Sequence, residues 1–163
     1  MQNVEIERKY LVKYMPKRFY AYPHKELVQA YLSFGDGDDP LEKRVRLMRN
    51  GAIEHFIYTE KGDGDISRSE YEMEITKKEY LALCKQVISA FVKKARYYIP
   101  AGEGLGAELD VYHGKLTGLV TVEVEFDSIE AADGFEPPEW FGDEITSDKR
   151  YKNKNLAKNG KPE

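Results

Sequence analysis

The sequence has few of the features that mark several common classes of protein. It contains one cysteine, Cys84, so no disulfide can form within the chain, and this is typical of proteins in a reducing compartment. It has no signal-type start and no apolar run of about 18 residues, the length that a membrane-spanning helix requires. We therefore expect a cytoplasmic protein with no membrane partner.

A large excess of charge of one sign is also lacking. The 25 basic residues nearly balance the 29 acidic residues, which gives a formal net charge of −4. A dedicated nucleic-acid-binding protein normally carries a marked basic excess, so we expect no nucleic-acid partner. The three histidines, His24, His55 and His113, match no zinc-binding spacing.

What the sequence does contain is repeated alternation of apolar and polar residues. It predicts eight strands, over 4–12, 27–34, 43–48, 53–61, 68–75, 92–99, 106–113 and 120–126. Apolar residues at helical spacing predict a helix over 77–91, and shorter helices are expected over 129–133 and 148–158. The chain has no linker and a length of about one domain, so residues 1–163 are predicted to form a single domain.

The polar faces of these strands carry charged residues two positions apart. In 4–12, Glu5, Glu7 and Lys9 share one face of the predicted strand. Other strands carry mainly bases, such as Arg44 and Arg46 in 43–48. Eight strands are enough to close a barrel. The sequence therefore predicts an α+β fold, with a closed eight-stranded antiparallel β-barrel, a charged lumen and helices packed outside.

A charged lumen indicates a particular chemistry. Ions that are taken out of water need compensation by water, metal ions or a charged ligand. Carboxylates on rigid strands are hard oxygen ligands that suit Mg²⁺ or Mn²⁺. Arginine and lysine side chains bind phosphate oxygens. Together they predict a metal-dependent phosphoryl-transfer site.

The segment EIERK at 5–9 resembles the E-x-E-x-K signature of the CYTH superfamily, the triphosphate tunnel metalloenzymes. Similar elements follow in order: QAYL (29–32), RVR (44–46), TEKG (59–62), RSEYE (68–72), KKARY (93–97), ELDVY (108–112), VEVEF (122–126) and ITSDKRYKNKNLA (145–157). The resemblance covers nearly the whole chain, and its last stretch is similar to small bacterial members. It implies a tunnel that binds a triphosphate with a divalent metal, closed at one mouth by the C-terminal helix.

The resemblance also implies roles for individual residues. The implied metal ligands are Glu5, Glu7, Glu70, Glu72, Asp110, Glu123 and Glu125. The implied substrate-binding residues are Lys9, Arg44, Arg46, Lys61, Lys94, Arg96 and, next to Lys149 on the C-terminal helix, Arg150. Catalytic roles are implied for Lys9, Tyr31 and Lys94. Glu74 extends the alternation of its strand, but members often have a non-acidic residue there, so we expect it at the wet end of the strand.

The predicted function is hydrolysis of a linear triphosphate, with inorganic tripolyphosphate as the first choice of substrate and Mg²⁺ or Mn²⁺ as cofactor. We expect Glu7 and the pair Glu123 and Glu125 to hold one ion. Three alternatives remain open: a class IV-type adenylyl cyclase, a thiamine triphosphatase with Trp140 and Phe141 as an aromatic platform, and a non-catalytic polyphosphate- or nucleotide-binding module. The resemblance also suggests a homodimer.

Overall fold

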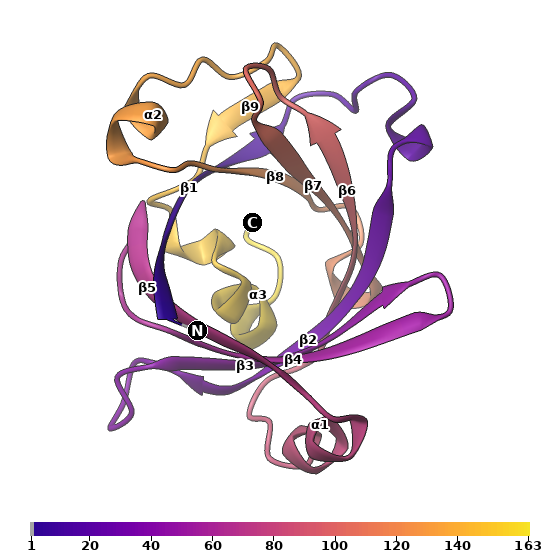
Figure 1. The fold of residues 1–163 in the computed structure, drawn as a ribbon, viewed down its shortest axis with the longest axis vertical. Coiled ribbons are helices and arrows are strands. Elements are labelled where there is room, and N and C mark those ends of the chain that lie inside the picture. The colour runs from indigo at the N-terminus through magenta and orange to yellow at the C-terminus, as the bar shows by residue number, and fades with distance from the viewer. Residues whose placement is uncertain (1) are drawn as a thin grey trace.

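Within residues 2–163, which the computed structural model describes, nine strands form one antiparallel sheet (Figure 1). The strands are β1 (Gln2–Val12), β2 (His24–Phe34), β3 (Glu42–Asn50), β4 (Ile53–Lys61), β5 (Ser67–Ile75), β6 (Val92–Pro100), β7 (Gly106–His113), β8 (Val120–Glu125) and β9 (Phe141–Glu144). Their order is β5-β4-β3-β2-β6-β7-β8-β1-β9, and β5 also pairs with β1. This pairing closes eight strands into the predicted barrel and leaves β9 outside it.

Each of the eight predicted strands is present in the structure, and β9 is an addition. This strand has only four residues, FGDE, with no alternation of polarity that would have identified it. It pairs with the end of β1 through Tyr10 opposite Glu144 and Val12 opposite Phe141, with a shift of register between them. It therefore extends the sheet beyond the closed barrel.

The apolar faces of the strands point outward, where helices and loops cover them. Over β1, β6, β7 and β8, the cover includes α2 (Ile129–Asp133), β9, the segment that joins them and η1 (Phe19–Ala21) of the β1–β2 connection. The buried residues of this cluster are Tyr10, Ile99, Ala107, Leu109, Val122, Val124, Phe126, Ala132 and Phe141. Over β3 and β4, α1 (Lys77–Cys84) packs Tyr80 against Val45 and Phe56. The polar faces are therefore left to line the inside of the barrel, as predicted.

The helix predicted over 77–91 is shorter in the structure, because α1 ends at Cys84. The chain beyond it binds to the edge of β2 instead of continuing the helix. The N–H of Ile88 donates to the carbonyl of Tyr31, and the N–H of Tyr31 donates to the hydroxyl of Ser89. The ladder between β2 and β6 reaches no further than Gln29. Ile88 and Ser89 thus satisfy the backbone N–H and carbonyl of Tyr31, which β6 leaves unpaired.

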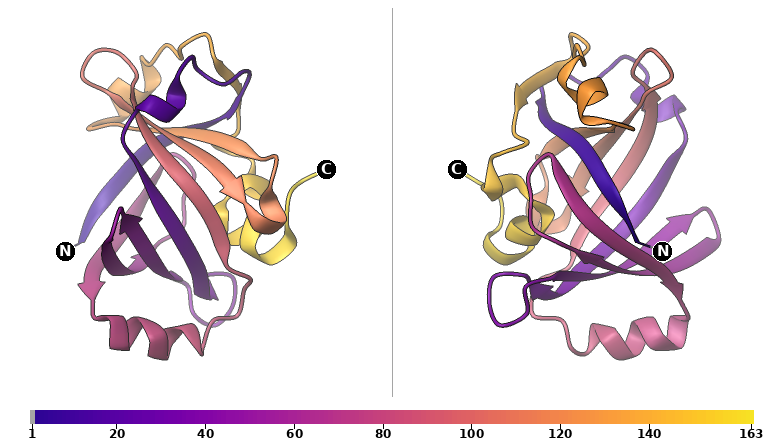
Figure 2. Two further views of the ribbon diagram at one scale, coloured as in Figure 1. Left: turned by 90° about the vertical axis from the view of Figure 1, so that its right-hand side faces the viewer. Right: turned by 60° about the vertical axis from the view of Figure 1, so that its left-hand side comes forward.

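The C-terminal helix predicted over 148–158 is divided in two. A 3-10 turn, η3 (Lys149–Tyr151), precedes α3 (Asn153–Asn159), and Lys152 between them is extended. Figure 1 shows α3 within the outline of the barrel, and Figure 2 places it at one end. Its buried residue Leu156 belongs to a cluster with Tyr31 and Tyr112 of the barrel. One mouth of the barrel is therefore covered, as expected.

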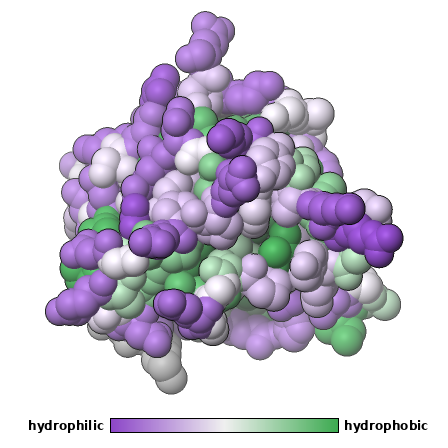
Figure 3. All heavy atoms as spheres, turned by 90° about the horizontal axis from the view of Figure 1, so that it is seen from above, coloured by the Kyte–Doolittle hydropathy of each residue, from purple (hydrophilic) through white to green (hydrophobic). Residues whose placement is uncertain are grey.

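The outer surface is mostly hydrophilic where Figure 3 shows it, with separate small hydrophobic patches. None of the helices between residues 2 and 163 has the length and apolar character needed to cross a bilayer.

Arg8 ties the outer layer of the molecule to β1. Its side chain points outward, opposite to its neighbours in sequence. The guanidinium donates to both carboxylate oxygens of Glu144 at 2.9 and 2.7 Å, and to the carbonyl of Ala132 at 2.7 Å. It thus joins β1 to β9 and to α2, which cover the largest apolar cluster.

We predict that Arg8→Met lowers the free energy of unfolding by about 1–3 kcal/mol, because it leaves partly buried acceptors without their charged donor. Urea denaturation followed by circular dichroism measures this loss. The matched control is Arg49→Met, which removes an exposed pair with Glu54 and should cost less than about 1 kcal/mol. Equal losses in the two variants would show that Arg8 has no special structural role.

Candidate active site

The lumen of the barrel contains a cavity of about 300 Å³ lined mainly by charged side chains. Its acidic residues are Glu5, Glu7, Glu42, Asp65, Glu70, Glu72, Glu108, Glu123 and Glu125. Its basic residues are Lys9, Arg44, Arg46, Lys61, Arg68, Arg96 and Lys152. Tyr31, Met48, Tyr98, Ile145, Thr146 and Asn153 complete the wall.

The register of the strands brings these residues together from distant parts of the chain. On β1 and β8, Glu7 lies opposite Glu125 and Lys9 lies opposite Glu123. Residues that are directly opposite in an antiparallel pair project from the same face, with Cβ atoms about 4.5–5.5 Å apart. The acids of the two strands therefore meet within one wall of the cavity.

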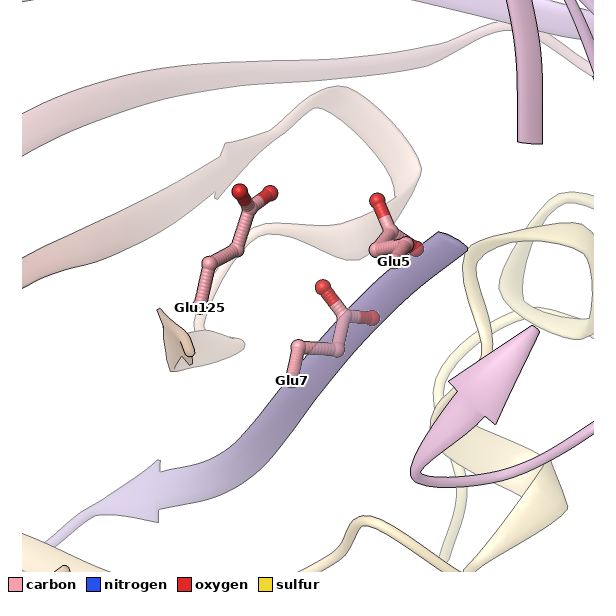
Figure 4. A group of neighbouring side chains, drawn as sticks. All are labelled: Glu5, Glu7 and Glu125. Atoms are coloured by element: carbon pink, nitrogen blue, oxygen red, sulfur yellow. The ribbon is translucent and has the colours of Figure 1, made fainter. Parts of the chain in front are cut away.

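Three of these carboxylates form a compact group. Glu5, Glu7 and Glu125 each offer an oxygen within 4.8 Å of the others. Figure 4 shows the three side chains pointing toward one another, two from β1 and one from the end of β8. Several convergent carboxylate oxygens are the ligand set that hard divalent cations prefer. The donor set therefore fits an ion such as Mg²⁺ or Mn²⁺.

The protonation of this group reflects its crowding. Burial, reinforced by Glu123 and Glu5, raises the pKa of Glu7 well above its ordinary value. Burial together with Glu108 and Glu5 raises the pKa of Glu125 to about 7. Burial also acts on Glu5, but Lys61 and Arg68 outweigh it and leave the pKa of Glu5 lowered. A bound cation would relieve the repulsion that raises the first two values.

Basic side chains gather on another part of the wall, formed by β3 and β6. Arg46 donates through Nε to the side-chain oxygen of Gln29 at 2.8 Å, and burial, with Arg44 and Arg96 beside it, lowers the pKa of Arg46 to about 9. Arg44 is buried, and within the described residues its Nε has no hydrogen-bond partner. A buried donor without a partner in a cluster of cations indicates a site for an anion.

The cavity therefore offers carboxylates for a cation and guanidinium groups for an anion. Known proteins are similar to this chain in sequence and in fold. No model of a protein family matches the chain. It is 44% identical over 154 residues to the inorganic triphosphatase of Nitrosomonas europaea, a match that covers 94% of this chain and 96% of the relative. It is 34% identical to the inorganic triphosphatase of Acetivibrio thermocellus, over 83% of this chain and 94% of that protein. The chain belongs to the inorganic triphosphatase family.

Solved structures agree with this assignment. The crystal structure of the inorganic triphosphatase NE1496 matches with a TM-score of 0.66 and 39% identity, over 94% of this chain and 93% of that one. The structure of PH1819 from Pyrococcus horikoshii, at 20% identity and a TM-score of 0.57, covers 79% of this chain and 82% of its own, and shares the fold. The resemblance to CYTH proteins that the sequence indicated is confirmed.

Within this triphosphatase fold, most of the residues assigned from the sequence line the cavity. Among the carboxylates outside the group of three, Glu70 lies 3.5 Å from Lys61. Glu123 lies 3.6 Å from Lys9, so it faces a base as well as Glu7. Glu72 also lines the cavity, 4.0 Å from Arg44. Glu74 lies at the wet end of β5, as expected, with a side chain that is 66% exposed and paired with His55.

Lys94 and Asp110 lie behind the cavity wall, not on it. Both are fully buried, and the Lys94 ammonium donates to the Asp110 carboxylate at 2.7 Å. The same carboxylate accepts from Nε of Arg96 at 2.8 Å and from its Nη2 at 2.9 Å. Asp110 is thus committed to two bases and lies apart from the three-carboxylate group. It holds the guanidinium of Arg96, which does line the cavity, in a fixed orientation.

The C-terminal segment contributes a different base from the one assigned. Arg150 pairs with Asp148 at 2.7 Å, its side chain is 60% exposed, and it does not line the cavity. The next base along the segment, Lys152, does so and donates to the carbonyl of Gly64 at 2.7 Å. The difference follows from the division of the predicted helix, because the extended backbone at Lys152 turns that residue inward.

Five charged lining residues were not assigned from the sequence, and one of them, Asp65, lies in the loop between β4 and β5. Arg68 and Glu108 lie on the polar faces of predicted strands, so alternation alone could have identified them. Arg68 bridges Glu42, at 3.2 Å, and Glu5, at 3.7 Å. Glu42 falls just before the strand predicted over 43–48, and a boundary one residue earlier would have included it. Lys152 had no periodic signal.

We predict that a divalent cation stabilises the protein through the three-carboxylate group. Mn²⁺ at about 100 times its dissociation constant should raise the free energy of unfolding by about 2.7 kcal/mol, measured as an upward shift in thermal midpoint. Glu125→Gln should reduce the shift, and the control Glu74→Gln, on the exposed end of β5, should retain it. An undiminished shift in Glu125→Gln would place the cation elsewhere.

Proposed function

We propose that the protein hydrolyses inorganic tripolyphosphate to pyrophosphate and phosphate in the lumen of its barrel, with Mg²⁺ or Mn²⁺ as cofactor. The observation that carries this proposal is the separation of charge in one cavity. Three carboxylates lie within 4.8 Å of one another, and a group of arginines with an unpartnered buried donor lies on the wall of β3 and β6. The two inorganic triphosphatase relatives support the choice of substrate.

In this proposal the basic wall binds and orients the substrate. Arg44, Arg46 and Arg96 are each less than 9% exposed, so their guanidinium groups act where water competes little. Several fixed guanidinium groups can hold the phosphates in line and stabilise the charge that develops in the transition state. Lys61 lines the cavity between the carboxylates of Glu5 and Glu70, at 2.9 and 3.5 Å.

The carboxylate group has the complementary part. Glu5, Glu7 and Glu125 would hold the cation, which when bound neutralises phosphate charge and lowers the pKa of a water molecule. Lys9 follows Glu5 and Glu7 on β1. It lines the cavity, and its ammonium donates to the carbonyl of Tyr151 at 2.6 Å. Its ammonium can exchange that carbonyl for a phosphate oxygen, which is the substrate-binding role that we propose for it.

The proposed roles of Lys94 and Tyr31 follow from their positions. Lys94 does not line the cavity, and through Asp110 it orients Arg96, so we propose a positioning role for it. Tyr31 lines the cavity beside Gln29, whose amide nitrogen lies 3.4 Å from its hydroxyl. Burial raises the pKa of Tyr31 to about 12, so at neutral pH its hydroxyl keeps its proton and can donate a hydrogen bond to a phosphate.

The alternative functions find less support among the described residues. Trp140 and Phe141, the aromatic pair considered for thiamine, pack in the outer core with ring centres 4.6 Å apart and do not line the cavity. A module that only binds anions would not need three converging carboxylates. The homodimer, the cytoplasmic location and the absence of nucleic-acid and membrane partners stay predictions.

The direct test is an assay of phosphate release from tripolyphosphate by protein stripped of metal. We expect release only after Mg²⁺ or Mn²⁺ is added, because the bound cation is needed to lower the pKa of the attacking water. Phosphorus-31 NMR should show pyrophosphate and phosphate as products, and turnover of ATP and thiamine triphosphate should be slower. Cyclic AMP from ATP, or no metal-dependent release at all, would refute the proposal.

Glu125→Gln should lower the rate of phosphate release with metal by more than about tenfold. The variant should keep its fold, because the outward face of β8 is unchanged. Circular dichroism checks the fold, and Glu74→Gln again serves as the matched control. An unfolded Glu125→Gln protein would instead assign the lumen charges a structural role.

A further inference from the structure

A second cavity, of about 460 Å³, opens at the end of the barrel where β2 begins and β3 and β6 end. We call it the Lys25 groove; its charged lining residues are Lys25, Glu26 and Arg49, and Asn50 and Tyr98 also line it. Tyr98 also lines the cavity of the candidate active site. The groove therefore shares a wall residue with that cavity.

Lys25 continues the row of bases on this wall. In the ladder between β2 and β6 it lies directly opposite Arg96, so the two side chains project from the same face with Cβ atoms about 4.5–5.5 Å apart. The Lys25 ammonium lies 5.4 Å from the centre of the Tyr98 ring. In the described part of the chain no carboxylate lies within ion-pair distance of it, whereas Arg49 is paired with Glu54 at 2.8 Å. Lys25 is thus the cation of the groove that is available to an anion.

Among the described residues, the opposite end of the barrel is covered by the C-terminal segment. There Leu156 of α3 packs with Tyr31 and Tyr112, and Lys152 joins the C-terminal segment to the β4–β5 loop through the carbonyl of Gly64. A linear anion too long for the main cavity can therefore extend only toward the end that carries the Lys25 groove. At that end the carboxylate group occupies β1 and β8, so a polyanion is favoured along β2 and β6.

We propose that the Lys25 groove is a subsite for the phosphate groups of a linear polyphosphate beyond the third. The proposal rests on the proposed function, which places the first three phosphates in the main cavity. Phosphate fits the groove better than a nucleoside base does, because the Lys25 ammonium already covers the Tyr98 ring on which a base would stack.

The experiment is calorimetric titration with tripolyphosphate and with tetrapolyphosphate in EDTA, where no metal supports hydrolysis. The readout is the ratio of the two affinities. Wild-type protein should bind tetrapolyphosphate about 5- to 10-fold more tightly, the gain expected for one ordinary hydrogen bond at a position that stays partly exposed to water. Lys25→Ala should bring the ratio close to one. The matched control Lys93→Ala removes the same charge from an exposed position on the outer face of β6 and should leave the wild-type ratio.

Equal affinities of wild-type protein for the two anions would overturn the inference, and so would an unchanged ratio in Lys25→Ala. A Lys25→Ala protein that loses affinity for ATP but not for tetrapolyphosphate would also overturn it, in favour of a nucleoside site. The phosphate-release assay is read separately. A protein with the expected ratio but no metal-dependent hydrolysis would refute the proposed function and leave the polyphosphate subsite standing.

Discussion

The pairing of β5 with β1 is the constraint on which the rest of the structure depends. It closes the sheet through contacts such as Glu5 opposite Arg68, and in a closed sheet each strand has one face that must point into the lumen. The apolar faces of the strands point outward and are covered by α1, α2 and β9. The faces that carry the ionisable residues must therefore point into the lumen. Without that closure Glu5 and its partners would lie on a wet sheet surface, where their pKa values would approach ordinary ones and their ion pairs would contribute little.

Charge confined in this way is compensated only in part. Behind the wall, Asp110 is matched by Lys94 and Arg96 at 2.7 and 2.8 Å, a local balance that keeps a buried carboxylate ionised. On the cavity surface the balance fails in two directions. Acids face acids around Glu7, whose pKa is raised by burial, Glu123 and Glu5. Bases adjoin bases around Arg46, whose pKa is lowered to about 9 by burial and, after it, by Arg44 and Arg96. A fully paired lumen would have no such deficits and no electrostatic reason to bind a metal together with a polyanion.

Alternation with a period of two was enough to predict the eight strands, the faces that turn inward and most of the lining residues, because period and face follow directly from strand geometry. It could not separate Asp110 from Glu7, since both lie on inward faces and only the neighbouring strands decide which carboxylate meets a base. The end of α1 was predicted too late in the chain, because Ile88 and Ser89 form hydrogen bonds with the backbone of Tyr31 instead of continuing the helix. These bonds join residues that are far apart in the sequence, so no local pattern indicates them. Lys152 lines the cavity in place of Arg150 because the backbone of Lys152 is extended between two helical segments. A helical sequence pattern does not indicate such an interruption.

The closed end of the barrel shares its bases with the candidate active site. Lys9 donates to the carbonyl of Tyr151 and lies 3.6 Å from Glu123, and Lys94 lies 3.4 Å from the side-chain oxygen of Asn153, which also accepts from Tyr112. The C-terminal segment is therefore held by two lysines of the barrel, Lys9 on the cavity and Lys94 behind its wall. A polyanion that draws Lys9 toward itself would weaken the bond from Lys9 to the carbonyl of Tyr151. Lys152, which also lines the cavity, makes a second link, from the C-terminal segment to the β4–β5 loop. If Lys9 binds substrate as proposed, substrate binding and closure of this mouth would be coupled through it, because the anion would compete with a backbone carbonyl, which is the weaker partner for an ammonium group.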